Sequence, residues 1–345
     1  MAERADLPPR RSIRTVGSAA TCDRIRHRSR AVSEVPAHEV RVRVCVIGAG
    51  AIGGLFAAHL AKVADVFVLT RRQEHAQALN ARGLRVSGRH DFTARVTATP
   101  DPGELPDFDV AIIATKATGL EQAAQSLNGR FADATIATVQ NGLGAEEVVR
   151  RHGEWHLISA VTFMSGTKHS DTHVEYILDT PTWLGPYGDT PYERVQELAQ
   201  LLIESGLEAE ALPDLRPAQW SKLIFNATVN GVAALTGLPH DAHFAAENVE
   251  SDLGHLVHAL VDEGKLVAAA ASVELRDDPW EMNVLATKRG SAHYPSMLED
   301  VEARRPTEVD LINGAIVREA ERHAVDAPLQ TAVYRLVAAR EASYS

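Results

Sequence analysis

The sequence predicts an α/β protein in which an N-terminal Rossmann domain, with a doubly wound and mainly parallel sheet, precedes an all-α C-terminal domain. Apolar runs without alternation at 42–47, 110–114 and 135–139 are typical of strands that are covered on both faces. Helical patterns lie between these runs, and a glycine-rich motif follows the first of them. From Pro213 onward, long helical patterns replace the strands.

The expected elements define two domains, a Rossmann domain at 41–212 and a helical domain at 213–345. In the first domain, a helix at 51–63, a strand at 65–69 and a helix at 73–82 continue the alternation. In the second, helices are expected at 217–237, 245–272, 279–291, 307–323 and 328–341. Prolines at 239, 279, 295, 306 and 328 are typical of helix starts and stops.

Residues 1–40 differ from the rest in composition. They carry eight arginines and five acids, a net charge of +3 that leaves −14 for the remainder. With three prolines and no apolar periodicity, they predict a disordered, arginine-rich tail. No apolar region follows the arginines, so a signal peptide is not expected.

Charge and composition narrow the function classes. A net charge of −11 over 345 residues argues against a general nucleic-acid binder. No apolar stretch approaches the ~20 residues that span a bilayer, so no membrane role is expected. The two cysteines, Cys22 and Cys45, and the 15 histidines show no zinc-type spacing. We expect a cytoplasmic protein without a metal site, either a monomer or a homodimer.

The glycine-rich motif is Gly48-Ala49-Gly50-Ala51-Ile52-Gly53. It stands directly after an expected strand and opens a helix, which is the context in which G-x-G-x-x-G binds a dinucleotide. The first glycine allows the turn, the second lets backbone approach the pyrophosphate, and the third allows close helix packing. A tight turn without a ligand is the alternative.

The end of the second strand bears on the cofactor. It reads Leu69-Thr70-Arg71-Arg72, without the acid that usually binds the ribose 2′-hydroxyl of NAD. Guanidinium groups can bind a 2′-phosphate in bidentate fashion, so the sequence favours NADPH/NADP+ with Arg71 as its contact. A solvated arginine at a helix start remains the alternative reading, chiefly for Arg72.

Two polar residues follow the later strands, at the edge where such sheets bind ligands. Lys116 follows the strand at 110–114, and Asn141 belongs to Gln140-Asn141-Gly142 after the strand at 135–139. Lys116 is either functional or a surface lysine. Asn141 is either functional or part of a turn, since Asn and Gly tolerate positive φ.

Lys222, Asn226 and Asn230 are spaced i, i+4 and i+8, so they share one face of an otherwise apolar helix. Unpaired buried polar groups cost roughly 1–3 kcal/mol each, so this stripe needs partners. These are either backbone carbonyls in the core or a substrate that carries keto, hydroxyl and carboxylate groups. A lysine there could protonate the alkoxide that forms when a hydride reduces a ketone.

Thr307 predicts a helix N-cap with Asp310 at N3, a variant of the capping box. Glu308 is then either a first-turn carboxylate that complements the helix dipole or a catalytic group. The pattern does not distinguish between the two.

Together these motifs resemble the ketopantoate reductase family over residues 42–340. They are the glycine-rich motif, Gln140-Asn141-Gly142, the Lys222/Asn226/Asn230 stripe, Ser296-Met297-Leu298-Glu299-Asp300, and Arg305-Pro306-Thr307-Glu308 followed by Val309-Asp310-Leu311-Ile312-Asn313-Gly314. The resemblance implies reduction of 2-dehydropantoate to (R)-pantoate with NADPH, in pantothenate and coenzyme A biosynthesis.

The resemblance also implies residue roles. Lys222 would be the general acid, with Glu308 beside it and the substrate hydroxyl. Asn226, Asn230 and Ser296 would bind the substrate, and Asn141, Lys116 and Arg71 would contact the cofactor.

The chain departs from the family pattern at His293 and at Gly231, and the tail has no counterpart. These departures leave two alternatives open. One is an NADPH-dependent reductase of another branched 2-keto or 3-hydroxy acid. The other is an NADPH-binding regulator without chemistry, against which the retention of Lys222, Asn226, Asn230 and Glu308 argues.

Overall fold

The computed structural model describes residues 41–244, 251–288 and 294–344, and the chain from Arg41 onward forms one compact unit. The predicted tail and His293 lie outside the described residues.

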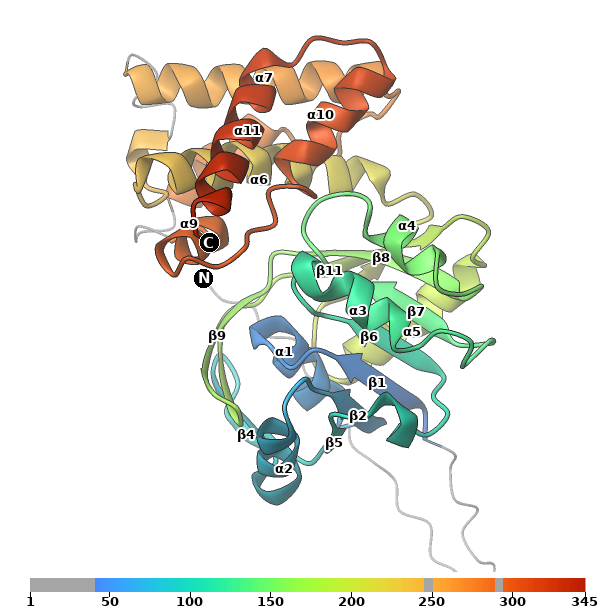
Figure 1. Ribbon diagram of the computed structural model, residues 1–345. Coiled ribbons are helices and arrows are strands. Elements are labelled where there is room, and N and C mark those ends of the chain that lie inside the picture. Colours follow the sequence, from blue (N-terminus) through green and yellow to red (C-terminus); the bar gives the residue numbers. More distant parts are fainter. Residues whose placement is uncertain (1–40, 245–250, 289–293, 345) are drawn as a thin grey trace, which may run out of the picture. The chain divides into compact units, whose positions relative to one another are not determined.

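The main sheet has eight strands and confirms the predicted doubly wound arrangement. Its strands are β1 (Arg43–Ile47), β2 (Asp65–Leu69), β5 (Thr97–Thr99), β6 (Val110–Ile113), β7 (Thr135–Thr138), β8 (His156–Thr162), β11 (Thr182–Tyr187) and β12 (Ala209–Ala211). They are ordered β12-β11-β8-β7-β6-β1-β2-β5, and β1, β2, β6 and β7 lie side by side in Figure 1. Every neighbouring pair is parallel except β8 and β11, which are antiparallel.

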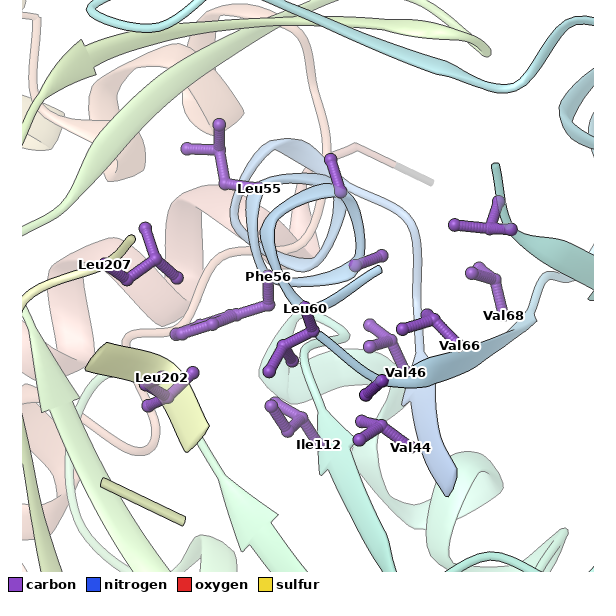
Figure 2. Packing of buried hydrophobic residues seen from close by; sticks show 14 of the residues in the cluster. Val44, Val46, Leu55, Phe56, Leu60, Val66, Val68, Ile112, Leu202 and Leu207 are labelled. Carbon is purple, nitrogen blue, oxygen red and sulfur yellow. The ribbon is translucent and has the colours of Figure 1, made fainter. Parts of the chain in front are cut away.

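Helices cover both faces of this sheet, which explains the continuous apolar strands. They are α1 (Ala51–Leu60), α2 (Gln73–Arg82), α3 (Leu120–Gln125), α4 (Ala145–Arg150) and α5 (Tyr192–Glu204), with 3-10 turns at Pro102–Glu104 and Ala117–Gly119. In β1, Val44 and Val46 pack with Phe56 of α1, as Figure 2 shows. Cys45 and Ile47 belong to a separate cluster that includes residues of α3 and α4. Both sets are buried because alternate side chains of a strand point to opposite faces.

A second, four-stranded sheet was not predicted. It consists of β3 (Leu84–Gly88), β4 (Phe92–Ala94), β9 (Ser165–Ser170) and β10 (His173–Leu178), in the order β4-β3-β10-β9. Its buried side chains join the core cluster of α1. Gly54 permits this packing, since a Cβ there would lie 2.9 Å from Cγ1 of Val174. The strands are short and largely polar, and β3 pairs with β10 about 90 residues later, so periodicity carries little signal.

The C-terminal part is helical, as predicted. Its helices are α6 (Arg216–Thr236), α7 (Asp252–Ala270), α8 (Pro279–Thr287), α9 (Ser296–Glu302), α10 (Asn313–Arg322) and α11 (Pro328–Ala342), with a 3-10 turn at Ala242–Phe244. Pro279 and Pro328 begin helices, as expected. A separate hydrophobic cluster is built from residues 220–337, and a small cluster joins Val161 of β8 to Leu215 and Ala218. Among the described helices, none has the length and apolar character needed to cross a bilayer.

The prediction for residues 307–323 is wrong in its first part. The helix begins at Asn313, and Thr307 does not cap it. Instead the Thr307 hydroxyl accepts a hydrogen bond from the Val309 amide (3.1 Å) two residues on, which forms a local turn. The Leu311 carbonyl accepts from the amide of Leu143 (2.9 Å), a distant loop. Tertiary contact therefore overrides the capping pattern, and Glu308 lies outside any helix.

His59 of α1 is buried beneath the second sheet. Its Nδ1 donates to the Leu55 carbonyl (2.8 Å), so its Nε2 must accept from Nδ1 of His90 (2.8 Å). Phe92 and Tyr176 pack edge-on against the ring. Burial lowers the pKa of His59 to about 4.

We predict that stability falls as the pH drops from about 6.5 to about 4. In this window the unfolded chain binds a proton at His59 that the native protein does not, which favours unfolding. Above about 6.5 both states are neutral there, and the contribution is constant. The loss should reach on the order of 3 kcal/mol, measured as the free energy of urea unfolding across this range.

His59→Gln provides the control, because its amide retains a donor and an acceptor and does not titrate. The pH dependence of wild type minus variant isolates His59 from the carboxyl groups. Identical slopes for the two proteins would contradict the prediction.

Candidate active site

The candidate site is formed where loops leave the carboxyl ends of β1, β2, β6 and β7. β1 lies between β2 and β6, so successive connections run in opposite directions from it. Ligands bind at such switch points in open α/β sheets.

The glycine-rich loop after β1 has the geometry that a pyrophosphate requires. Gly48 has φ +96°, and a Cβ on Gly53 would lie 1.9 Å from the Gly48 carbonyl oxygen. Around Gly50, by contrast, a Cβ would meet no atom within 4 Å, which leaves room for a ligand at the backbone. Among the described residues, no side chain caps α1 and no acid occupies its first turn. The positive end of α1 is thus available for a phosphate.

The two arginines after β2 differ in their surroundings. The Arg72 guanidinium donates to both carboxylate oxygens of Asp171 (2.6 and 2.7 Å), on the turn between β9 and β10. Arg71 is exposed, and its guanidinium has no hydrogen bond or ion pair within the described part of the chain. Arg71 is therefore the arginine that an external anion can engage without displacing a carboxylate.

Lys222, Asn141 and Glu308 form one hydrogen-bonded chain. Lys222 Nζ donates to Asn141 Oδ1 (2.9 Å), and Asn141 Nδ2 donates to Glu308 Oε2 (2.9 Å). The Ala117 amide donates to Glu308 Oε1 (3.1 Å). Asn141 thus presents its carbonyl to the cation and its amide to the carboxylate, and the loops after β6 and β7 together hold Glu308.

The contact between residues 307–311 and the loop after β7 holds Glu308 in position. Leu143 donates to the Leu311 carbonyl, and Gly142 has φ +103°. A Cβ on Gly142 would lie 1.9 Å from the Leu311 carbonyl oxygen. The glycine is therefore needed both for its backbone conformation and for the close approach.

The environment of Lys222 tunes its acidity. The side chain is partly buried, and its ammonium also donates to the Thr162 carbonyl at the end of β8. The Phe163 ring centroid lies 5.1 Å from Nζ. Burial lowers the pKa of Lys222 to about 8, and the negative charge of Glu308 partly opposes this shift. A lysine with this pKa is protonated at neutral pH yet can donate its proton.

The remaining residues of the predicted substrate set are brought near this chain. Asn226 Nδ2 lies 3.5 Å from Asn141 Oδ1. Asn230 Oδ1 accepts from the Met297 amide (3.3 Å), in the first turn of α9. Ser296 begins that helix and is exposed. Asn226 and Asn230 therefore have hydrogen-bond partners within the protein, Asn141 and the Met297 amide.

Sequence reasoning missed Asp300, which has a side chain only 2% exposed. Its carboxylate accepts from Lys116 (2.6 Å to Oδ2) and from Nε of Arg305 (2.9 Å). Lys116 is thus paired with a buried acid rather than simply solvated. Asp300 stands in the motif at 296–300, but no local pattern links it to a lysine 184 residues away. Among the described residues, no three His, Cys, Asp or Glu side chains gather as a metal site would require.

Comparisons with known proteins show which family and fold the chain shares. A family model described as Ketopantoate reductase PanE/ApbA matches residues 44–189, and the model of its C-terminal part matches 214–341. The 2-dehydropantoate 2-reductase of Pyrococcus horikoshii is 29% identical over 301 residues, 87% of this chain and 98% of that protein. A PanE/ApbA family ketopantoate reductase structure from Ralstonia eutropha JMP134 has a TM-score of 0.78 at 26% identity, covering 88% of this chain and 99% of its own. A D-mandelate dehydrogenase, solved with NADH and anilino(oxo)acetate, shares the fold, with a TM-score of 0.79 at 24% identity and coverage of 88% and 99%.

The docking of residues 307–311 predicts that Gly142→Ala is strongly destabilising. The added methyl group meets the Leu311 carbonyl, and alanine at positive φ costs a further ~1–2 kcal/mol. Gly129→Ala is the matched control, because Gly129 has φ +69° but its Cβ would meet nothing within 4 Å. Chemical unfolding should show that Gly142→Ala lowers the free energy of unfolding by about 2 kcal/mol or more beyond the loss in Gly129→Ala. Equal losses would mean that the contact does not constrain the loop.

Proposed function

Because this chain belongs to the ketopantoate reductase family, and is thus an oxidoreductase that acts on a keto group, we propose that it reduces 2-dehydropantoate to (R)-pantoate with NADPH. The observation that carries the proposal is the Lys222–Asn141–Glu308 chain at the edge of the sheet where the glycine-rich loop lies. The product would serve pantothenate and coenzyme A biosynthesis in the cytoplasm. The enzyme would act as a monomer or as a homodimer.

The loop residues 48–53 fit a dinucleotide, and a structural relative is solved with NADH. When bound, NADPH supplies the hydride for the keto carbon. Arg71 supports the 2′-phosphorylated form, because its guanidinium is unengaged where the adenosine ribose lies in Rossmann domains. Lys116 and Asn141 would contact other polar groups of the cofactor.

Lys222 acts as the general acid in this proposal. As the keto carbon is reduced, its oxygen takes a proton from the Lys222 ammonium, so the alkoxide never accumulates and a hydroxyl group results. The neutral amine then regains a proton from solvent. Glu308 keeps the ammonium charged beforehand and accepts a hydrogen bond from the substrate hydroxyl. Asn226, Asn230 and Ser296 would bind the substrate's hydroxyl and carboxylate groups.

The first experiment follows NADPH oxidation with 2-dehydropantoate at varied pH. We expect kcat/KM to be level below about pH 8 and to fall up to tenfold per pH unit above it, as Lys222 loses its proton. Lys222→Ala should lower kcat by ~10²-fold or more.

Lys265→Ala serves as a control, since this lysine pairs with Asp278 on the surface, apart from the site. A rate that stays level to pH 9.5, or a Lys222→Ala variant with wild-type kcat, would exclude Lys222 as the acid.

A second candidate is reduction of another 2-keto acid by the same residues. This candidate is supported by the D-mandelate dehydrogenase that shares the fold, because that enzyme is solved with anilino(oxo)acetate. A panel of 2-keto acids distinguishes the two: higher kcat/KM for one that lacks the 4-hydroxyl group would displace 2-dehydropantoate. Tight NADPH binding without turnover of any 2-keto acid in the panel would favour an NADPH-binding regulator.

Arg71 should govern the choice of cofactor. We expect Arg71→Ala to raise the KM for NADPH by roughly tenfold or more and to leave the KM for NADH unchanged, because only NADPH carries the 2′-phosphate. Arg82→Ala, in the last turn of α2, is the control. Unchanged values for both cofactors in Arg71→Ala would refute the assignment.

A further inference from the structure

A second group of charges lies beside the glycine-rich loop, brought there by the hairpin of β9 and β10. Lys168 of β9 donates from Nζ to the Ala49 carbonyl (3.1 Å), inside the loop. The same ammonium lies 3.1 Å from Asp171 Oδ1. Asp171 in turn holds Arg72, and His75 Nδ1 lies 3.7 Å from it. The hairpin therefore joins the loop after β1 to the residues after β2.

Charge balance at this group favours a strongly anionic ligand. Arg71, Arg72 and Lys168 are cationic, and Asp171 is the carboxylate that pairs with Arg72 and Lys168, so these four residues carry a net charge of +2. Glu74, in the first turn of α2, adds one negative charge to this region. Burial would raise the pKa of Asp171, but hydrogen bonds from Arg72 and Lys168 outweigh it and hold the pKa below its usual range. Burial lowers the pKa of His75, so its ring adds no charge at neutral pH. The region stays positive, and a phosphate monoester, with a charge near −2, is attracted to it.

Lys168 has a donor left for such a ligand. An ammonium group carries three N–H donors, and the protein engages two of them, at Ala49 and Asp171. The side chain is 29% exposed, so the third can reach a ligand. Its contact to Ala49 sets it next to the open space at Gly50, and the Asp171–Arg72 pair sets it near the end of β2.

We infer that Lys168 is a cofactor-specificity residue, which binds the 2′-phosphate of NADPH together with Arg71. The inference rests on the proposed function, since it presumes the phosphorylated cofactor. The contrasting role for Lys168 is a purely structural link between hairpin and loop. Such a link would affect every adenine nucleotide equally, whereas a phosphate contact discriminates between them.

Titration calorimetry with 2′,5′-ADP and 5′-AMP separates these roles without requiring turnover. We expect Lys168→Ala to weaken the binding of 2′,5′-ADP by tenfold or more and to change the affinity for 5′-AMP by less than threefold. Lys168→Arg should recover most of the lost affinity for 2′,5′-ADP. His169→Ala is the matched control: it is the next residue on β9, paired with Glu175, and alternation turns it to the other face. It should bind both nucleotides as wild type does.

Equal weakening of both nucleotides by Lys168→Ala, or no weakening of either, would overturn the inference. If wild type binds 2′,5′-ADP no tighter than 5′-AMP, the proposed preference for NADPH falls and the inference falls with it. If wild type prefers 2′,5′-ADP and Lys168→Ala retains the full preference, only the role of Lys168 is refuted.

Discussion

The docking of residues 307–311 onto the loop after β7 determines where the reactive groups meet. One backbone hydrogen bond, from Leu143 to Leu311, and the absence of a side chain at Gly142 bring the two segments together. Glu308 consequently faces Asn141, 167 residues earlier in the chain, and through it Lys222 of α6. The same contact uses the Leu311 carbonyl, and α10 begins only at Asn313. The contact that holds the Glu308 carboxylate in position therefore also keeps residues 307–311 out of helix α10.

Two lysines at this edge of the sheet show how their partners set their chemistry. Lys116 meets the buried carboxylate of Asp300 directly and so forms a charge pair. Lys222 instead bonds to neutral acceptors, the Asn141 amide oxygen and the Thr162 carbonyl, with Glu308 one side chain further away. Neutral acceptors replace lost water without cancelling charge, so burial can lower the pKa of Lys222 to about 8. A lysine in this environment is suited to transfer protons, whereas Lys116 keeps its charge paired with Asp300.

Local patterns were reliable where residues close together in the chain set the limits of an element. β1 and α2 begin and end within a residue of their expected limits, and Pro279 and Pro328 start helices as expected. Patterns were unreliable where distant partners complete a structure. The second sheet has polar strands, and α9 is short, with its Met297 amide donating to Asn230, so both carry little periodic signal. Thr307 has a sound capping pattern that a stronger tertiary contact displaces.

The sequence by itself determined the fold class, the glycine-rich loop and the shared helix face of Lys222, Asn226 and Asn230, because each depends on residues within a few turns of one another. Only the tertiary structure decided which groups meet: Lys222 with Asn141 and Glu308, Lys116 with Asp300, and Arg72 with Asp171. It also brought a carboxylate close to the end of β2, where the local sequence has none. Side chains 80 to 190 residues apart leave no spacing to read, since their encounter follows from how strands and helices pack.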